Sequence, residues 1–203
     1  MDYDPERGDP YVHMLKLPNE YPWEWETTFM GQVMMHNYYL YQVIDKVMLE
    51  QGVLDNPLLG GIVELGTGSG SLTVILGLWA LRLGIIVTTF DNDAWLSSPL
   101  HPLFVRLGIQ FYEKDVLDRD TAVVAERLND VPVLLICDNG NKVMEFHKYA
   151  SVCRSGSVVL CHDYGQEVAY GQLDEFAEKN GYEKYLEDQW MKHNVQVVLY
   201  RRK

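Results

Sequence analysis

The sequence predicts an α/β fold, in which helices cover both faces of a mostly parallel sheet of seven strands and the last strand runs antiparallel. Short apolar runs alternate with helical segments, an order that is typical of parallel sheets. The runs are apolar almost throughout, as expected of strands buried on both faces. Only a few residues separate the two closing runs, and this spacing favours an antiparallel pair.

Each predicted element depends on a local pattern. Residues 1 to about 26 are rich in proline, acidic and aromatic side chains without a period, and they predict an irregular lead-in. From about Asn37 to Gly52, apolar residues recur every three or four positions and predict a helix. Strands are expected at 62–65, 85–90, 109–113, 132–137, 157–161, 183–189 and 194–201. Helices are expected at 71–83, about 102–107, 120–128, 142–152 and 168–179, most of them followed closely by a glycine.

Length and charge restrict the kinds of protein that this chain can be. With 203 residues it can build one full core and little more, so we expect one domain over 1–203, with 1–52 as an aromatic-rich lead-in and helix. A net charge of −12 argues against a nucleic-acid partner, because such partners are normally met by a basic surface. No apolar run approaches the ~20 residues that span a bilayer, and we expect no membrane partner.

The cysteines and the first residues predict a compartment. Cys137, Cys153 and Cys161 are odd in number and lie in apolar runs, which favours reduced, buried thiols over a disulfide framework. The chain begins with an acidic segment that lacks the basic and apolar regions of a signal peptide. We therefore expect a cytoplasmic protein.

A glycine-rich turn follows the strand at 62–65 and opens the helix at 71–83. Gly66, Gly68 and Gly70 alternate with Thr67 and Ser69, so backbone N–H groups are unobstructed and positive φ angles are accessible. The start of the helix favours an anionic ligand group. About 21 residues beyond Gly70, the next strand ends in Asp91, a distance that suits an acid bound to ribose hydroxyls. The stretch predicts a nucleotide site.

The details of this turn favour one kind of nucleotide over another. A dinucleotide site requires Gly-x-Gly-x-x-Gly, but Ser71 occupies the third glycine position. Glu64 would repel a pyrophosphate, whereas it could accept from an ammonium or hold the glycine loop. A cofactor with a cationic sulfonium and an amino-acid tail fits this charge better than NAD does.

The chain resembles the class I S-adenosylmethionine-dependent methyltransferases, which have a Rossmann-like fold with one reversed strand. The resemblance lies in the loop from Glu64 to Gly70, in Asp91 and in Asp115 after the third strand. It implies that the loop, Thr67 included, holds the methionine part of the cofactor. It also implies that Asp91 binds the ribose, that Asp115 lies by the adenine, and that Glu64 is the acid that opens the motif.

Two further segments resemble a narrower group of small-molecule O-methyltransferases, related to cephalosporin hydroxylase and the macrolide-sugar methyltransferases. They are Asp138-Asn139-Gly140-Asn141 and His162-Asp163-Tyr164. The resemblance implies O-methylation of a small-molecule hydroxyl, on a sugar or secondary metabolite, and a divalent cation, Mg or Mn, held by Asp138, His162 and Asp163. His162 replaces an acid of catechol-type relatives, and imidazole suits softer ions than magnesium.

Several alternatives remain open at this stage. Without a metal, Asp138 and Asp163 would cap loops and touch the cofactor, while His162 would be a candidate general base. Lys142 is another candidate base, although a lysine one turn into a helix is more often solvated. His36 and His147 are expected to be packing or surface residues.

The lead-in from Trp23 to Tyr41 suits substrate selection, core packing or an interface between subunits of a homo-oligomer. An NAD-type oxidoreductase and a catalytically silent binding module are the rival functions.

Overall fold

The computed structural model describes residues 15–16, 27–29, 32–34, 36, 39–51, 59–92, 100–117, 121–192 and 195–203. Its main sheet has seven strands in the order β6-β5-β4-β7-β8-β10-β9. The strands are β4 (Gly61–Leu65), β5 (Ile86–Asp91), β6 (Gln110–Glu113), β7 (Val133–Cys137), β8 (Val158–His162), β9 (Tyr182–Lys184) and β10 (Val197–Arg202). Strand β10 is antiparallel to β8 and β9, and the pairs among β4 to β8 are parallel. The predicted fold class is confirmed.

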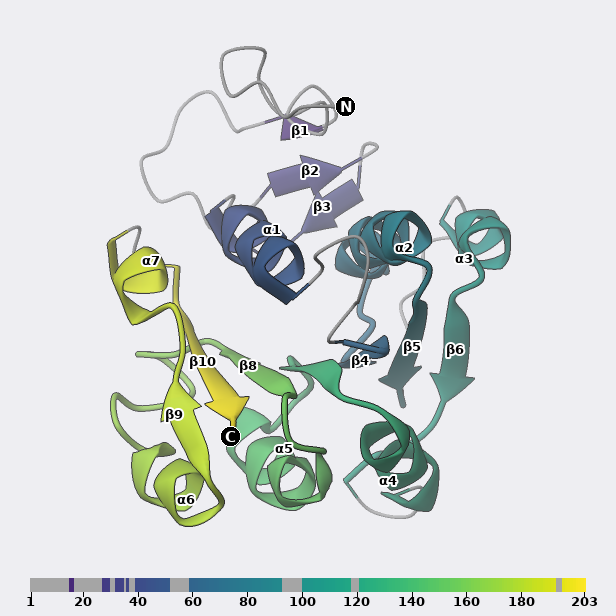
Figure 1. Ribbon diagram of the computed structural model, residues 1–203. Coiled ribbons are helices and arrows are strands. Elements are labelled where there is room, and N and C mark those ends of the chain that lie inside the picture. Colours follow the sequence, from purple (N-terminus) through teal and green to yellow (C-terminus); the bar gives the residue numbers. More distant parts are fainter. Residues whose placement is uncertain are drawn as a thin grey trace.

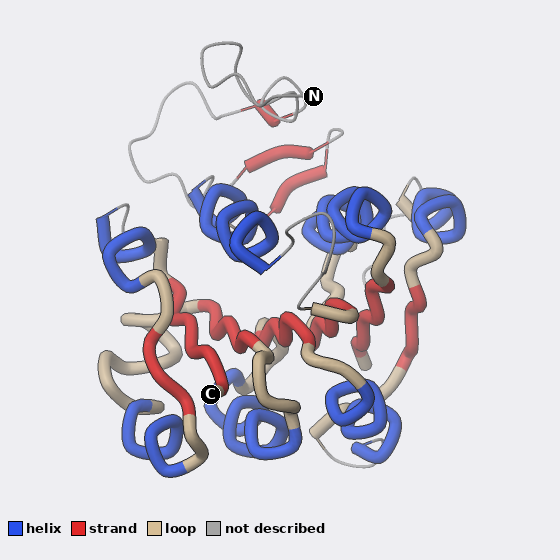
Figure 2. Tube along the Cα trace, viewed as in Figure 1, coloured by secondary structure: helices blue, strands red, loops and turns tan. Residues whose placement is uncertain are grey.

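Helices cover both faces of this sheet (Figure 1). One layer contains α1 (Tyr39–Gln51), α2 (Ser71–Leu83), α3 (His101–Leu107) and α7 (Glu187–Lys192). The other contains α4 (Thr121–Asp130), α5 (Lys142–Tyr149) and α6 (Asp174–Lys179), with a short 3₁₀ helix, η2 (Ala150–Val152), after α5. The sheet lies edge-on between the layers in Figure 2. None of the described helices is long and apolar enough to cross a membrane.

The core explains why the central strands are apolar at every position. All five residues of β4, β7 and β8 are buried, since helices cover each face. Cys137 and Cys161 are partners in adjacent strands, and both thiols are free and buried. The predicted reduced, buried cysteines are confirmed.

Residues 15–34 include a small sheet that the sequence analysis did not predict. Strands β1 (Leu15–Lys16), β2 (Thr27–Phe29) and β3 (Gln32–Met34) pair antiparallel in that order. Strands of two or three residues are too short to show an alternating pattern. Trp23 and Trp25 of the lead-in, for which substrate selection, core packing and a subunit interface were the expected roles, lie outside the described residues.

The C-terminal third differs from the prediction in two places. The helix expected at 168–179 begins only at Asp174, because Gly165 and Gly171 adopt positive φ angles in the turns before it. The strand expected at 183–189 ends at Lys184. Leu186 then takes a left-handed φ of 54°, and helix α7 follows it. The antiparallel pairing of the two closing strands is nevertheless confirmed.

Candidate functional site

The ends of the parallel strands bring the predicted site residues to one edge of the sheet. The register pairs Leu65 with Cys137 and Cys137 with Cys161, so the residues that follow β4, β7 and β8 are neighbours. Asp91 ends β5, and its carbonyl oxygen accepts from the N–H of Lys114 at 2.9 Å. This contact places Asp115, after β6, at the same edge.

Close packing explains the first glycine of the loop after β4. Gly66 has φ 99°, and its N–H donates to the carbonyl of Phe90 at 2.8 Å. A Cβ atom at this position would lie 2.4 Å from the carbonyl oxygen of Asp138, closer than any real contact. The glycine loop therefore lies directly against the end of β7.

The other two glycines shape the outer part of the loop. Gly68 has φ 49°, and none of the described residues comes within 4 Å of where its Cβ would be, so they leave open space beside it. Its N–H donates to Oδ2 of Asp91 at 2.8 Å, which connects the loop to the end of β5. Gly70 adopts the left-handed conformation immediately before α2. The loop thus exposes backbone next to an acidic side chain.

Glu64 is fully buried beneath this loop. Its Oε2 accepts from the hydroxyls of Thr73 at 2.6 Å and Thr89 at 2.7 Å, and Thr67 is hydrogen-bonded to Thr89 at 2.6 Å. Burial raises the pKa of Glu64 to about 8, although the two threonine hydroxyls oppose the shift. Its Oε1 has no hydrogen-bond partner among the described residues. Of the two roles left open by the sequence, holding the loop is visible in these contacts.

Asp115 lies half-buried beyond β6. Its Oδ1 accepts from the N–H of Leu117 at 3.0 Å, a local turn that orients the carboxylate. Glu64, the glycines, Asp91 and Asp115 therefore lie along the β4, β5 and β6 side of the edge, in the order that the sequence predicts for a nucleotide site.

A second cluster lies next to the loop, where β7 and β8 end. Asp138 contacts two imidazoles: Oδ2 lies 2.8 Å from Nε2 of His36, and Oδ1 lies 3.3 Å from Nδ1 of His162. The two rings meet edge to face with centroids 4.8 Å apart. The side chains are only 13% (His36), 14% (Asp138) and 10% (His162) exposed, so water screens them weakly.

Asp163 and Lys142 extend this cluster. Nδ1 of His162 also lies 3.1 Å from Oδ1 of Asp163. The other oxygen of Asp163 is 2.8 Å from Nζ of Lys142, which is equally close to Glu167. Asp163 has a left-handed φ of 57°, uncommon for a residue with a side chain and frequent at functional sites.

These contacts determine the charges of the cluster. Burial opposes ionisation of Asp138, but His162 and His36 outweigh it and hold the pKa of Asp138 well below its usual range. Burial lowers the pKa of His162, yet Asp138 and Asp163 raise it to about 9. Burial likewise lowers the pKa of Lys142, but Asp163 and Glu167 raise it above its ordinary value. A lysine held as an ammonium orients carboxylates and is a poor general base.

His36 belongs to this cluster, whereas we expected a packing or surface residue. It lies between β3 and α1, more than a hundred residues before Asp138 in the chain. A lone histidine in an irregular segment has no spacing that could indicate its partners. His147, by contrast, is exposed on α5, in agreement with the expectation.

Local capping fixes the loop between Asp138 and Lys142. Asn141 caps helix α5, since its Oδ1 accepts from the N–H of Met144 at 3.0 Å. Glu145 accepts from the N–H groups of Asn139 at 3.3 Å and Asn141 at 3.2 Å. Burial raises the pKa of Glu145 to about 7, against the effect of these backbone donors. The two side chains hold the end of β7 in place from the helix that follows it.

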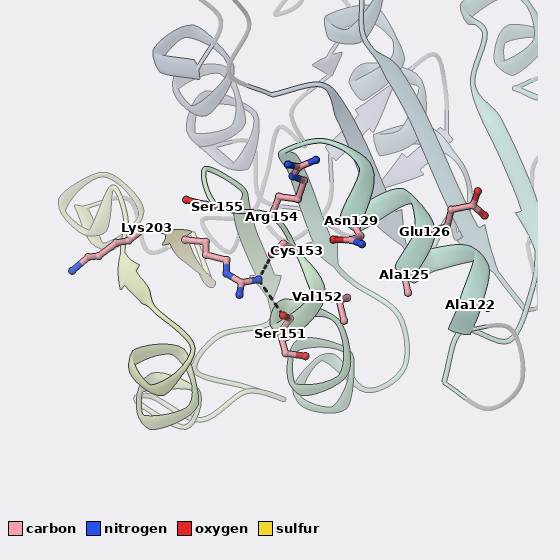
Figure 3. A pocket seen from close by; sticks show the side chains of 11 residues that line it. Ala122, Ala125, Glu126, Asn129, Ser151, Val152, Cys153, Arg154, Ser155 and Lys203 are labelled. Carbon is pink, nitrogen blue, oxygen red and sulfur yellow. Dashed lines mark hydrogen bonds between the residues drawn. The ribbon is translucent and has the colours of Figure 1, made fainter.

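A cavity of about 750 Å³ lies elsewhere, between α4, η2 and the last residues of the chain (Figure 3). It is lined by Arg154, Arg202 and Lys203 together with small and polar side chains. Arg202 is used structurally, since its Nη1 donates to the carbonyls of Ser151 and Cys153. None of the site residues named above lines this cavity.

Comparisons with known proteins define the fold. No protein-family model and no curated protein matches the chain by sequence. Among solved structures, CmcI, described with Mg and S-adenosylmethionine, is 17% identical with a TM-score of 0.63, over 100% of this chain and 86% of that one. CalS11, described as a TDP-rhamnose 3'-O-methyltransferase of calicheamicin biosynthesis, is 16% identical with a TM-score of 0.55, over 80% and 79%. A methyltransferase from Geobacter sulfurreducens is 14% identical with a TM-score of 0.52, over 80% of each chain.

These similarities show that the chain has the Rossmann-like fold of the class I S-adenosylmethionine-dependent methyltransferases. The fold agrees with the resemblance found in the loop from Glu64 to Gly70 and in the acids of the following strands.

Proposed function

We propose that this protein is an S-adenosylmethionine-dependent methyltransferase that transfers a methyl group to a hydroxyl of a small molecule, a sugar or a secondary metabolite, with the help of a divalent cation. The fold supports this function, as do the described ligand of CmcI and the described substrate of CalS11.

One observation supports the proposal above all others. The glycine loop and the histidine–aspartate cluster meet at Asp138: its backbone oxygen lies against Gly66, its N–H donates to the carbonyl of Leu65 at 2.9 Å, and its side chain contacts His36 and His162. A cofactor on the loop and a substrate on the cluster would therefore be neighbours, as group transfer requires.

The residues of the loop fit the methyl donor. The open space beside Gly68 admits a ligand to the backbone, and Asp91 provides a carboxylate for ribose hydroxyls. Oε1 of Glu64 is a buried polar atom with no hydrogen-bond partner among the described residues, so a polar group of the ligand could pair with it. Asp115, which follows β6 at the same edge, is the residue we propose beside the adenine. A pyrophosphate on the loop would instead lie near the carboxylates of Asp91 and Asp138, which disfavours a dinucleotide.

The residues of the cluster fit a divalent cation. Asp138, His162 and Asp163 are the proposed ligands, and their carboxylate and imidazole atoms suit such an ion. When bound, the cation would lower the pKa of a coordinated hydroxyl and fix its position. Lys142 orients Asp163 through an ion pair, and Asp138 aligns the two imidazoles. The low exposure of these side chains keeps water away from the hydroxyl.

Thermal-shift titration tests the cofactor assignment. S-adenosylmethionine or its product S-adenosylhomocysteine at about 100 times its Kd should stabilise the protein by about 2.7 kcal/mol, while NAD should have no effect. Asp91→Ala should abolish the shift. Asp130→Ala, an exposed carboxylate on α4, should leave it unchanged.

The outcomes separate the rival functions. A shift with NAD and none with the sulfur cofactors would overturn the proposal in favour of an oxidoreductase. Binding of S-adenosylmethionine without methyl transfer to any member of a panel of sugars and phenols would favour a silent binding module.

A further inference from the structure

We propose that His36 is a metal ligand, so that His36, Asp138 and His162 form a site with two imidazoles and one carboxylate that prefers Zn²⁺ or Fe²⁺ to Mg²⁺. This inference rests on the divalent cation of the proposed function. It changes which residues bind that cation and which metal the cation is.

The geometry of the three side chains supports this donor set. One nitrogen from each histidine and one oxygen of Asp138 all lie within 4.8 Å of one another. Metal–ligand bonds of about 2.1 Å place neighbouring ligand atoms about 3.0–3.4 Å apart in octahedral or tetrahedral sites. Asp138 makes two contacts close to this range, one through each carboxylate oxygen: Oδ2 lies 2.8 Å from Nε2 of His36, and Oδ1 lies 3.3 Å from Nδ1 of His162. A small rearrangement would accommodate an ion.

The carboxylates around His162 favour a positive group at the same place. Its Nδ1 lies 3.3 Å from a carboxylate oxygen of Asp138 and 3.1 Å from one of Asp163. The lone pair of a neutral imidazole would repel both oxygens, whereas a single N–H points well at only one of them. A cation among the three atoms would satisfy them together. The three carboxylates of Asp138, Asp163 and Glu167 also outnumber the ammonium of Lys142 and a protonated His162 by one, which leaves an excess of negative charge.

Lys142 reduces the availability of Asp163 as a ligand. Its ammonium lies 2.8 Å from Oδ2 of Asp163 and is only 8% exposed, so the ion pair is well shielded. Oδ2 of Asp138, in contrast, faces an imidazole that can change from hydrogen-bond donor to ligand by losing one proton. We therefore place Asp163 beside the ion as a hydrogen-bonded neighbour and His36 in its coordination sphere.

Imidazole ligands determine which ions the site prefers. Magnesium binds oxygen ligands almost exclusively, whereas zinc and iron accept imidazole nitrogen. Replacing one imidazole by a carboxylate should therefore strengthen binding of Mg²⁺ relative to Zn²⁺. This expectation concerns the ratio of two affinities, so it does not depend on the general order in which divalent ions bind proteins.

The test measures binding of Zn²⁺ and Mg²⁺ by calorimetry, without cofactor, to wild type and to three variants. His36→Ala should weaken Zn²⁺ binding by at least about 100-fold. His36→Asp should restore part of the Zn²⁺ affinity. It should also raise the ratio of Mg²⁺ affinity to Zn²⁺ affinity by at least about 10-fold over wild type. His101→Ala removes an exposed imidazole on α3 and should change neither the Zn²⁺ affinity nor the affinity ratio. Circular dichroism confirms that each variant is folded, and Co²⁺ absorption reports the loss of a nitrogen ligand.

Unchanged Zn²⁺ affinity and Co²⁺ spectrum in both folded His36 variants would overturn the proposal, as would tighter binding of Mg²⁺ than of Zn²⁺ to wild type. Titration with S-adenosylhomocysteine in the same variants separates this failure from failure of the proposed function. Retained cofactor binding with no effect of His36 on the metal would refute only the donor set.

Discussion

Glu64 lies fully buried beneath the glycine loop, where its Oε2 accepts from two threonine hydroxyls. Thr73 belongs to α2 and Thr89 to β5, so this carboxyl group connects the strand before the loop with its two neighbours. The connection has an electrostatic cost, because burial penalises the charged form of the carboxyl group. Glu64, the acid that opens the motif in the sequence, should therefore hold its proton near neutral pH.

The shifted pKa of Glu64 predicts a pH dependence of stability. The pKa rises from 4.5 to about 8 on folding, so the folded protein binds this proton more tightly than the unfolded chain. The contribution of Glu64 is complete below the lower value and is lost as the pH rises through the higher one. The Glu64→Gln variant lacks this pH-dependent contribution, so its stability should not fall with it. Relative to wild type, the variant should therefore become more stable as the pH rises from about 5 to about 8.

Urea denaturation at several pH values measures this difference. Glu178→Gln, on the exposed side of α6, should follow wild type at every pH. A constant difference between Glu64→Gln and wild type across the range would show that the carboxyl group is not protonated in the folded protein.

At the scale of elements, helix α5 connects the fold to the site. It starts immediately after the loop that carries Asp138, and both Asn141 and Glu145 bind backbone N–H groups at that start. Lys142, in its first turn, reaches Asp163 at the end of β8. The helix therefore positions the residues that follow two strands, Asp138 and Asp163. Loss of its N-terminal cap should disturb the positions of both.

Removal of this cap should cost stability. Asn141→Ala should lower the free energy of unfolding by about 1 kcal/mol, because the N–H of Met144 loses its acceptor. Asn141→Ser should keep most of the stability that the cap contributes, since serine caps helices about as well as asparagine. Chemical denaturation gives the two values, with Asn129→Ala on α4 as an exposed control. Equal losses in the alanine and serine variants would mean that capping is not what Asn141 contributes.

At the scale of the whole molecule, the sheet places the site residues that end or follow its strands on one edge, while the helical layers bury its centre. Strands β4, β7 and β8 are buried at every position, whereas β9 forms one border of the sheet and is only partly buried. The site is thus built on the most protected part of the molecule, and this suits a site that must hold two ligands in fixed geometry.

Hydrogen exchange should reveal this gradient. Amides of β4, β7 and β8 should exchange most slowly, near the rate set by global unfolding, and those of β9 much faster. Mass spectrometry of peptides from the exchanged protein measures the exchange rates of the β4, β7 and β8 amides and of the β9 amides in the same experiment. Equal protection of β8 and β9 would show that the sheet opens as one unit.

The sequence by itself determined the architecture and the glycine-loop side of the proposed site. Apolar runs and glycine stops are local patterns, so the strands from β4 to β8 and most helices could be predicted, as could the register of the glycine loop with Asp91 and Asp115. Short strands and turns such as those at Leu186 leave no such pattern, and there the predicted boundaries were wrong.

Only the tertiary structure decided the composition of the second cluster. Its members come from separate segments, and their chemistry depends on distances that no local pattern records. His36, between β3 and α1, meets Asp138 although 102 positions separate the two residues in the chain. Lys142 changes from a candidate base to a buried ammonium because Asp163 and Glu167 lie beside it. Long-range contacts set the protonation and the ligands of a site, and these contacts exist only in the folded chain.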